Sequence, residues 1–242
     1  MRRIGIEVKR RKSENNDQQS VFRRTHRMRR ILTGMGCLAA ALVMGGCTQR
    51  VALFNGENLD GWKTYVQDDA AEPEAVWSVH DGVLHCKGTP TGYIRTVESY
   101  SDYILELEWR WPEEPTNSGV LLHTIGEDKI WPQCIEAQLK HQNAGDLVTI
   151  QPGSIITVNG VRYQPEGESI FKIVPKKDSS SENPVGQWNH YKIVCKGETI
   201  DLYVNGVHQN RAFNVWPSAG AICLQSEGSP IEFRNIVLTP LR

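Results

Sequence analysis

The stretch Ile104-Leu-Glu-Leu-Glu-Trp-Arg110 alternates apolar and charged residues along its length. Side chains of a β-strand point alternately to its two faces, so this period of two predicts a half-buried strand with Glu106, Glu108 and Arg110 on the open side. The same alternation recurs at 120–123 and 135–140. We therefore expect three strands that present ionisable groups on one face of a sheet. Such a face is suited to the floor of a polar groove that binds carbohydrate.

Short strand-like segments separated by turn signals fill the chain around this stretch, from an expected first strand at 77–79 to a last one at 231–239. His80-Asp-Gly82, Lys196-Gly-Glu198 and Val204-Asn-Gly206 have the composition of tight hairpin turns. No segment shows a sustained apolar period of 3.6. Many short antiparallel strands predict an all-β sandwich or jelly roll.

The N-terminal 47 residues predict an export signal rather than part of the fold. The first thirty carry eleven Lys or Arg against three acidic residues, and the next sixteen are apolar or small and lead into Cys47. This pattern is typical of a lipoprotein signal in which Cys47 is lipidated after cleavage. Met28-Arg-Arg-Ile has the form of a normal signal start, so we expect that translation begins at Met28 and that residues 1–27 come from a start codon assigned too far upstream. The alternative is an uncleaved anchor, and both place residues 48–242 outside the cytoplasm, in the periplasm or on the cell surface, held to a membrane such as the outer membrane.

The charge and length of the predicted mature part limit its partners and its organisation. It carries 16 basic and 25 acidic side chains, a net charge near −9, which argues against nucleic acid as a partner. About 195 residues suffice for one domain with a sizeable core. Cysteines 86, 134, 195 and 223 stand singly within strand-like runs, so we expect buried free thiols rather than disulfides.

A series of short motifs, in order and nearly complete, resembles the 3-keto-disaccharide hydrolase family, also catalogued as domain of unknown function 1080. The resemblance covers residues 51–241, essentially the whole mature chain. The motifs are Leu53-Phe-Asn-Gly-Glu-Asn-Leu-Asp-Gly-Trp62, Trp77-Ser-Val-His-Asp-Gly-Val-Leu84, Leu107-Glu-Trp-Arg110, Asn117-Ser-Gly-Val120, Glu136-Ala-Gln138, Gly186-Gln-Trp-Asn189, Val204-Asn-Gly206, Leu224-Gln225 and Phe233-Arg-Asn-Ile236.

The resemblance implies a concanavalin A-like jelly roll of two packed antiparallel sheets, with the ligand on the concave sheet. It also implies cleavage of glycosides already oxidised at C3 of the sugar, with release of the aglycone or second sugar. Two departures leave the substrate open. Cys134-Ile-Glu136 stands where many relatives have an aromatic residue before the Glu, and the following loop reads His141-Gln-Asn-Ala-Gly-Asp146.

A 3-keto sugar offers an easy route to cleavage, because the carbonyl acidifies the proton on C2. The reaction needs a base, a group that stabilises the enolate and an acid for the leaving group. The candidates are Glu136 or His123 as base, Arg110 or His141 facing the oxyanion, and Glu108 or Glu227 as acid. For Glu136 the alternative is a cross-strand ion pair with Arg110 that only shapes the groove.

Further polar residues are expected to bind the substrate. Gln138 lies two residues after Glu136 on the same face, where a standard two-carboxylate glycosidase would carry a second acid, so an ordinary glycosidase is not indicated. Trp131 is a candidate for stacking on a sugar ring. The substrate-binding candidates are Arg110, Asn117, Gln138, Asp146, Gln225, Glu227 and Arg234.

No cofactor is expected. The hypothesis of a divalent metal held by His123, Glu136, His141 and Asp146, which would polarise the 3-keto group, stays open without a ligand spacing to support it. Two other functions also stay open: a non-catalytic carbohydrate-binding lipoprotein, and a structural lipoprotein whose polar sheet is an interaction face.

Overall fold

The computed structural model describes residues 49–67 and 72–241. All of them belong to the compact unit Gly46–Arg242. The predicted export signal and Cys47 lie outside the described residues. Within the described part of the chain, no helix is long and apolar enough to cross a membrane.

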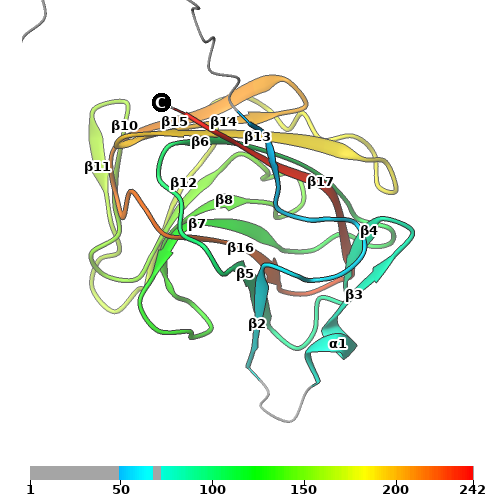
Figure 1. Ribbon diagram of the computed structural model, residues 1–242. Helices are drawn as coiled ribbons and strands as arrows, with labels where there is room; N and C mark the ends of the chain where they lie inside the picture. The colour runs from blue at the N-terminus through cyan, green and yellow to red at the C-terminus, as the bar shows by residue number, and fades with distance from the viewer. Residues whose placement is uncertain (1–48, 68–71, 242) are drawn as a thin grey trace, which may run out of the picture. The chain divides into compact units, whose positions relative to one another are not determined.

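Two antiparallel sheets, stacked face to face, make up this unit (Figure 1). The ten-stranded sheet has the order β11 (Val161–Tyr163), β10 (Ile155–Val158), β15 (Val207–Trp216), β14 (Thr199–Val204), β13 (Asn189–Lys196), β6 (Tyr103–Arg110), β17 (Ile231–Pro240), β4 (Val83–Cys86), β3 (Trp77–His80), and β1 (Val51–Ala52) also pairs with β17. The seven-stranded sheet has the order β12 (Phe171–Val174), β9 (Leu147–Ile150), β8 (Gln133–Gln138), β7 (Gly119–Ile125), β16 (Ala221–Ser226), β5 (Gly92–Thr96), β2 (Trp62–Val66). The one helix among the described residues is the single turn α1 (Pro73–Val76).

The predicted all-β sandwich is confirmed, and alternation builds its core. Leu105, Leu107 and Trp109 of β6 are fully buried and pack in one cluster with Val120 of β7 and Ile135 of β8. Burial of this apolar surface between the sheets is the main stabilising term of such a sandwich.

The expectation that the three polar stretches share one sheet is wrong. β6 pairs with β13 and β17, whereas β7 and β8 pair with each other in the other sheet. The charged residues of β6 therefore lie on the outer face of the ten-stranded sheet, and Glu136 lies on the outer face of the seven-stranded one. Alternation along a strand predicts which of its residues share a face, but it does not predict which sheet the strand belongs to.

The predicted turns and thiols agree with the structure. Asp81 and Gly82, between β3 and β4, both have positive φ, as do Asn205 and Gly206 between β14 and β15, which is the backbone of a tight hairpin turn. All four described cysteines are buried and free. The structure contains three strands that the sequence did not predict: β1, β2 and β11. The first and last of these are too short to show a period of two, and burial along β2 does not alternate.

Candidate functional site

A cavity of about 200 Å³ opens on the outer face of the seven-stranded sheet. Its volume is roughly that of six or seven water molecules, which suits one ring-sized group. We call it the cradle. It is lined by Asn117, Trp131, Glu136, Gln138, Val148, Phe171, Ile173 and Glu227.

Glu136 is the buried acid of the cradle. Its side chain points outward from the central strand β8, yet the residue is only 4% exposed and its Oε1 has no hydrogen-bond partner within the protein. Burial raises its pKa well above the usual range, and the nearby carboxylates of Glu227 and Asp146 raise it further. A buried carboxyl with a strongly raised pKa that lines a cleft is typical of a functional site.

Gly119 of β7 makes room for two polar side chains. A Cβ atom at this position would lie 2.3 Å from Oε1 of Glu136 and 2.4 Å from Oε1 of Gln225. Gln225, on β16, is 1% exposed, and neither end of its amide has a partner within the protein. The carboxyl and the amide therefore converge above Gly119, with the Oε1 of Glu136 and both ends of the Gln225 amide buried and without partners in the protein.

Glu227 brings a second carboxyl into the cradle from a different part of the chain. It follows β16, and an isolated β-bridge joins it to Asn117 just before β7. Burial raises the pKa of Glu227, and the side chains of Asn117 and Lys140 offset part of this rise. The sequence pattern, which placed Gln138 where a second acid was sought, did not show that Glu227 would stand beside Glu136.

Gln138 presents a donor to the cradle. Its Oε1 accepts hydrogen bonds from the backbone N–H groups of Leu139 at 3.0 Å and Lys140 at 2.9 Å. These bonds fix the orientation of the amide, so Nε2 is the end of the side chain left to donate to a ligand.

Asp146 lies near the cradle but does not line it. Its Oδ1 accepts a hydrogen bond from the backbone N–H of Lys176 at 2.9 Å and lies 3.7 Å from the Nζ of the same residue. Burial raises the pKa of Asp146, and the contacts with Lys176 oppose this rise. Asp146 thus ties the loop after β8 to the segment after β12 and acts on Glu136 through its charge.

His123 lies in the interior and not in the cradle. Simple alternation would put it on the same face as Leu121, but a bulge between Leu122 and Ile125 turns it inward, and its φ is +55°. Its ring is fully buried, 5.8 Å from the ring of Tyr103 in the other sheet, and its Nδ1 lies 3.1 Å from the carbonyl of Pro217. Burial lowers its pKa to about 4.

Glu108, Arg110 and Arg234 lie on the outer face of the ten-stranded sheet, away from the cradle. Arg110 pairs with Glu232 directly opposite on β17, so the alternative in which it forms an ion pair with Glu136 is wrong. Arg234 pairs with Glu108. Both guanidinium groups stack over Trp188, at 4.6 Å and 4.0 Å from its ring centroid. This face is an ion-pair cluster built around one aromatic ring.

His141 lies in a separate pocket beyond the end of β8, where its Nδ1 is 3.4 Å from Oε2 of Glu182. The four residues of the metal hypothesis are therefore not brought together. Among residues 49–67 and 72–241, no group of three or more His, Cys, Asp or Glu side chains is arranged to hold a metal ion.

The apolar wall of the cradle includes three residues that the sequence did not indicate: Val148, Phe171 and Ile173. Phe171 of β12 meets Trp131 edge to face, with ring centroids 5.3 Å apart and an interplanar angle of 80°. Phe171 and Ile173 lie two residues apart, which predicts that they share one face of a short strand. Nothing in the local sequence indicates that this strand lies in the same sheet as β8. Gly119, whose role was not predicted either, lies within the Asn117-Ser-Gly-Val120 motif.

Known structures share this fold. Two crystal structures from Parabacteroides distasonis ATCC 8503, both provisionally described as glycosyl hydrolases, are 21% and 24% identical to this chain, with TM-scores of 0.58 and 0.57. Each similarity covers 80% of this chain, and 94% and 100% of the respective structures. The β-glucanase of Bacillus licheniformis is 16% identical, with a TM-score of 0.53, over 82% of this chain and all of the enzyme. At these identities the similarity shows the fold alone, a concanavalin A-like jelly roll.

The family comparison covers nearly the whole described part. No curated protein matches the chain. Residues 49–239 match the model of a family described as the 3-keto-alpha-glucoside-1,2-lyase-like domain. With an all-β sandwich and a buried acid in a ring-sized cradle, this carbohydrate-processing chain belongs to the 3-keto-alpha-glucoside-1,2-lyase-like domain family.

Proposed function

We propose that this protein cleaves glycosides whose sugar carries a ketone at C3, by removing the proton on C2 next to that ketone. Membership of a family named for 3-keto-glucoside lyase activity supports the proposal. The observation that carries it is the carboxyl of Glu136, which is buried and has no partner at Oε1 in a cavity of one-ring size. A carboxyl kept free of partners in this way suits proton transfer better than ion pairing.

The chemistry uses two carboxyl groups in different protonation states. Glu136 as carboxylate takes the C2 proton, and the electron pair of the C–H bond moves into the enolate of the C3 ketone. The enolate then reforms the carbonyl while a C1–C2 double bond forms and the C1–O bond breaks. Glu227 as neutral acid donates its proton to the departing oxygen. Addition of water to C1, with return of a proton to C2, completes hydrolysis.

The raised pKa values suit these roles. A base abstracts a carbon-bound proton more effectively when its pKa lies near the working pH than when it lies near 4. Burial raises the pKa of both carboxyls, and the charge of Glu227 raises that of Glu136 further, so the reactive form, with Glu136 charged and Glu227 neutral, is the less populated of the two forms in which the pair shares one proton.

Amide groups are the candidates to stabilise the enolate. Nε2 of Gln138 is left to donate, and Nε2 of Gln225 has no partner within the protein. Preorganised neutral donors of this kind stabilise developing negative charge where water is excluded. They take the place that the sequence analysis gave to Arg110 or His141.

Purified protein incubated with a 3-keto-glucoside and with its unoxidised parent tests the proposal. We expect release of the aglycone from the 3-keto compound alone, because the parent lacks an acidic C2 proton. E136Q should abolish release without loss of fold, while the matched variant E106Q, on the outer face of the other sheet, should keep it. Binding of either sugar without release would favour the alternative, a non-catalytic carbohydrate-binding protein, and unfolding of E136Q would favour a structural role for Glu136.

We propose further that the reaction needs no cofactor, since acid, base and donors are all supplied by the chain. Turnover should survive treatment with a chelator. Loss of turnover that one divalent metal restores would contradict this.

We also propose that the protein is exported and held to a membrane by a lipid on Cys47. The support is the run of basic, then apolar and small residues that ends at this cysteine. Mass spectrometry of the mature N-terminus should find a lipid-modified Cys47, and C47A should release the protein from the membrane fraction. An unmodified N-terminus that retains residues 28–46 would favour the uncleaved anchor.

A further inference from the structure

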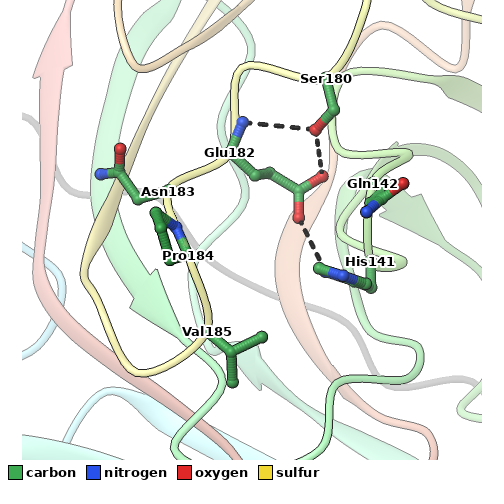
Figure 2. A pocket seen from close by; sticks show the side chains of 7 residues that line it. All are labelled: His141, Gln142, Ser180, Glu182, Asn183, Pro184 and Val185. Atoms are coloured by element: carbon green, nitrogen blue, oxygen red, sulfur yellow. Dashed lines mark hydrogen bonds and ion pairs between the residues drawn. The ribbon is translucent and has the colours of Figure 1, made fainter.

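A second pocket, of about 480 Å³, opens between the loop after β8 and the segment after β12. Figure 2 shows the residues that line it: His141, Gln142, Ser180, Glu182, Asn183, Pro184 and Val185. We call it the His141 pocket. It shares no lining residue with the cradle and has more than twice its volume.

Glu182 lies beside the imidazole ring of His141. The Glu182 side chain is only 4% exposed. Its Oε1 accepts hydrogen bonds from the backbone N–H of Ala144 at 3.2 Å and from Oγ of Ser180 at 3.1 Å. Its Oε2 faces Nδ1 of His141 at 3.4 Å, and Figure 2 shows the contacts with Ser180 and His141. Nδ1 is buried and faces this carboxylate without a hydrogen bond, so Nε2 is the ring atom that can meet a ligand.

Further hydrogen-bonding groups stand at the same opening. Asn183 donates its Nδ2 to the carbonyl of Trp188 at 2.8 Å, so its Oδ1 is left as an acceptor. Gln142 is exposed and has a φ of +64°, a conformation costly for a residue other than glycine. Its carbonyl accepts a hydrogen bond from Nζ of Lys176 at 2.6 Å, which helps to hold this backbone in place.

The chemistry of the lining favours a neutral, hydroxylated ligand. The two ionisable groups of the pocket, His141 and Glu182, face each other, so the pocket offers no unpaired charge to an ion. Hydroxyl groups both donate and accept, and so match a mixture of amide and imidazole partners. Val185 is 46% exposed beside Pro184 and gives an apolar surface on which the C–H face of a sugar can rest.

We propose that the His141 pocket is a second carbohydrate-binding site, which binds a neutral saccharide of at least two sugar units without cleaving it. The volume supports more than one ring, since the cradle, at less than half this volume, suits a single ring. The proposal does not depend on catalysis in the cradle.

Titration of the protein with maltose, followed by calorimetry and by the imidazole resonances of His141, tests this site. Maltose has no 3-keto group, so the proposed reaction does not consume it. We expect binding that shifts the His141 resonances and that weakens by about tenfold in H141Q and in N183A. E182Q, which keeps the shape of residue 182, should weaken binding as well, because the ring loses the carboxylate that faces its Nδ1. The matched control H80Q, a substitution of an exposed histidine on β3, should bind maltose like the wild type.

E136Q separates this site from the proposed catalytic one. It should bind maltose in the His141 pocket like the wild type, even though the proposed function predicts that it turns over nothing. Binding of maltose that shifts only residues of the cradle would overturn the second site, and so would unchanged affinity in folded H141Q or no binding at all. Absence of turnover on 3-keto-glucosides would refute only the proposed function.

Discussion

Gly119 lies beneath the carboxyl group of Glu136 so closely that a Cβ atom there would come within 2.3 Å of Oε1. In the ladder between β7 and β8, Gly119 stands opposite Gln138, and Glu136 stands opposite Leu121. Glu136 therefore reaches diagonally across the ladder to occupy the space that the missing side chain leaves. The floor of the cradle is thus set by a residue that contributes no functional group.

G119A should displace the carboxyl of Glu136 and the amide of Gln225 together. Because the new methyl group cannot coexist with either oxygen, we expect kcat/KM on a 3-keto-glucoside to fall by about 100-fold, as for a misplacement of about 1 Å. Steady-state kinetics measure this, with circular dichroism to show that the fold is kept. The matched control is G126A, which places a methyl group in open space at a φ of +84° and should lose stability but not activity. Equal activity of G119A and wild type would mean that the position of Glu136 does not matter for turnover.

E227Q should move the pH dependence of catalysis. The charge of Glu227 contributes to the raised pKa of Glu136, and removing that charge lowers it. The carboxyl of Glu136 should therefore titrate at lower pH in E227Q than in wild type, and the falling limb of kcat/KM against pH, along which the Glu227 acid loses its proton, should disappear. The maximum should also fall, because the acid for the leaving group is lost. A pH–rate profile measures the loss of the limb, and the side-chain carboxyl resonance of Glu136 measures the change in its titration. An unmoved titration of Glu136 in E227Q would show that Glu136 and Glu227 do not interact.

E136Q should become more stable relative to wild type as the pH rises. The pKa of Glu136 is raised in the folded state, so the stability linked to its proton is fully present below the unfolded value of about 4.3 and is lost as the pH rises towards the folded value. Glutamine does not titrate, so E136Q does not lose this stability as the pH rises. Urea unfolding at a series of pH values should show a difference between E136Q and wild type that grows above pH ~4.3. A pH-independent difference would mean that Glu136 is not desolvated.

The fold could be predicted from the sequence because its signals are local. Alternation in β6 identified Leu105 and Trp109 as core, and Asn205-Gly206 marked a hairpin without any knowledge of distant residues. Glu136 and Gln138 could be assigned to one face for the same reason, since they lie two residues apart in one strand.

The rest of the site depends on long-range pairing that a period cannot show. Glu227 reaches Glu136 only because β16 lies beside β7, and Phe171 reaches Trp131 only because β12 and β9 extend the same sheet. His123 shows a second limit, since one extra residue in β7 reverses the face on which its side chain lies.

R110A should leave catalysis unchanged and cost some stability. Arg110 lies on the outer face of the other sheet, where it pairs with Glu232 and stacks on Trp188. Loss of these partly exposed contacts should lower the free energy of unfolding by about 1 kcal/mol. Chemical denaturation measures the stability and steady-state kinetics the activity, with R162A, on the short edge strand β11, as an arginine control that has neither contact. A large fall in kcat for R110A would restore this residue to the oxyanion role that the sequence pattern suggested.

H123F should keep catalysis and remove a source of acid instability. The ring of His123 is buried in the neutral form, with a pKa of about 4 in the folded protein against about 6.5 in the unfolded chain, and the charge of Asp102 offsets only part of the effect of burial. A lowered folded pKa means that wild type loses stability as the pH falls from ~6.5 towards ~4, by up to about 3 kcal/mol, whereas phenylalanine cannot take up a proton. Loss of the contact with Pro217 should cost H123F a constant amount at every pH, so the test is the slope of the difference in unfolding free energy and not its size. A flat difference between pH 4 and 6.5 would show that His123 is not buried as a neutral ring, and a loss of turnover in folded H123F would return His123 to consideration as the base.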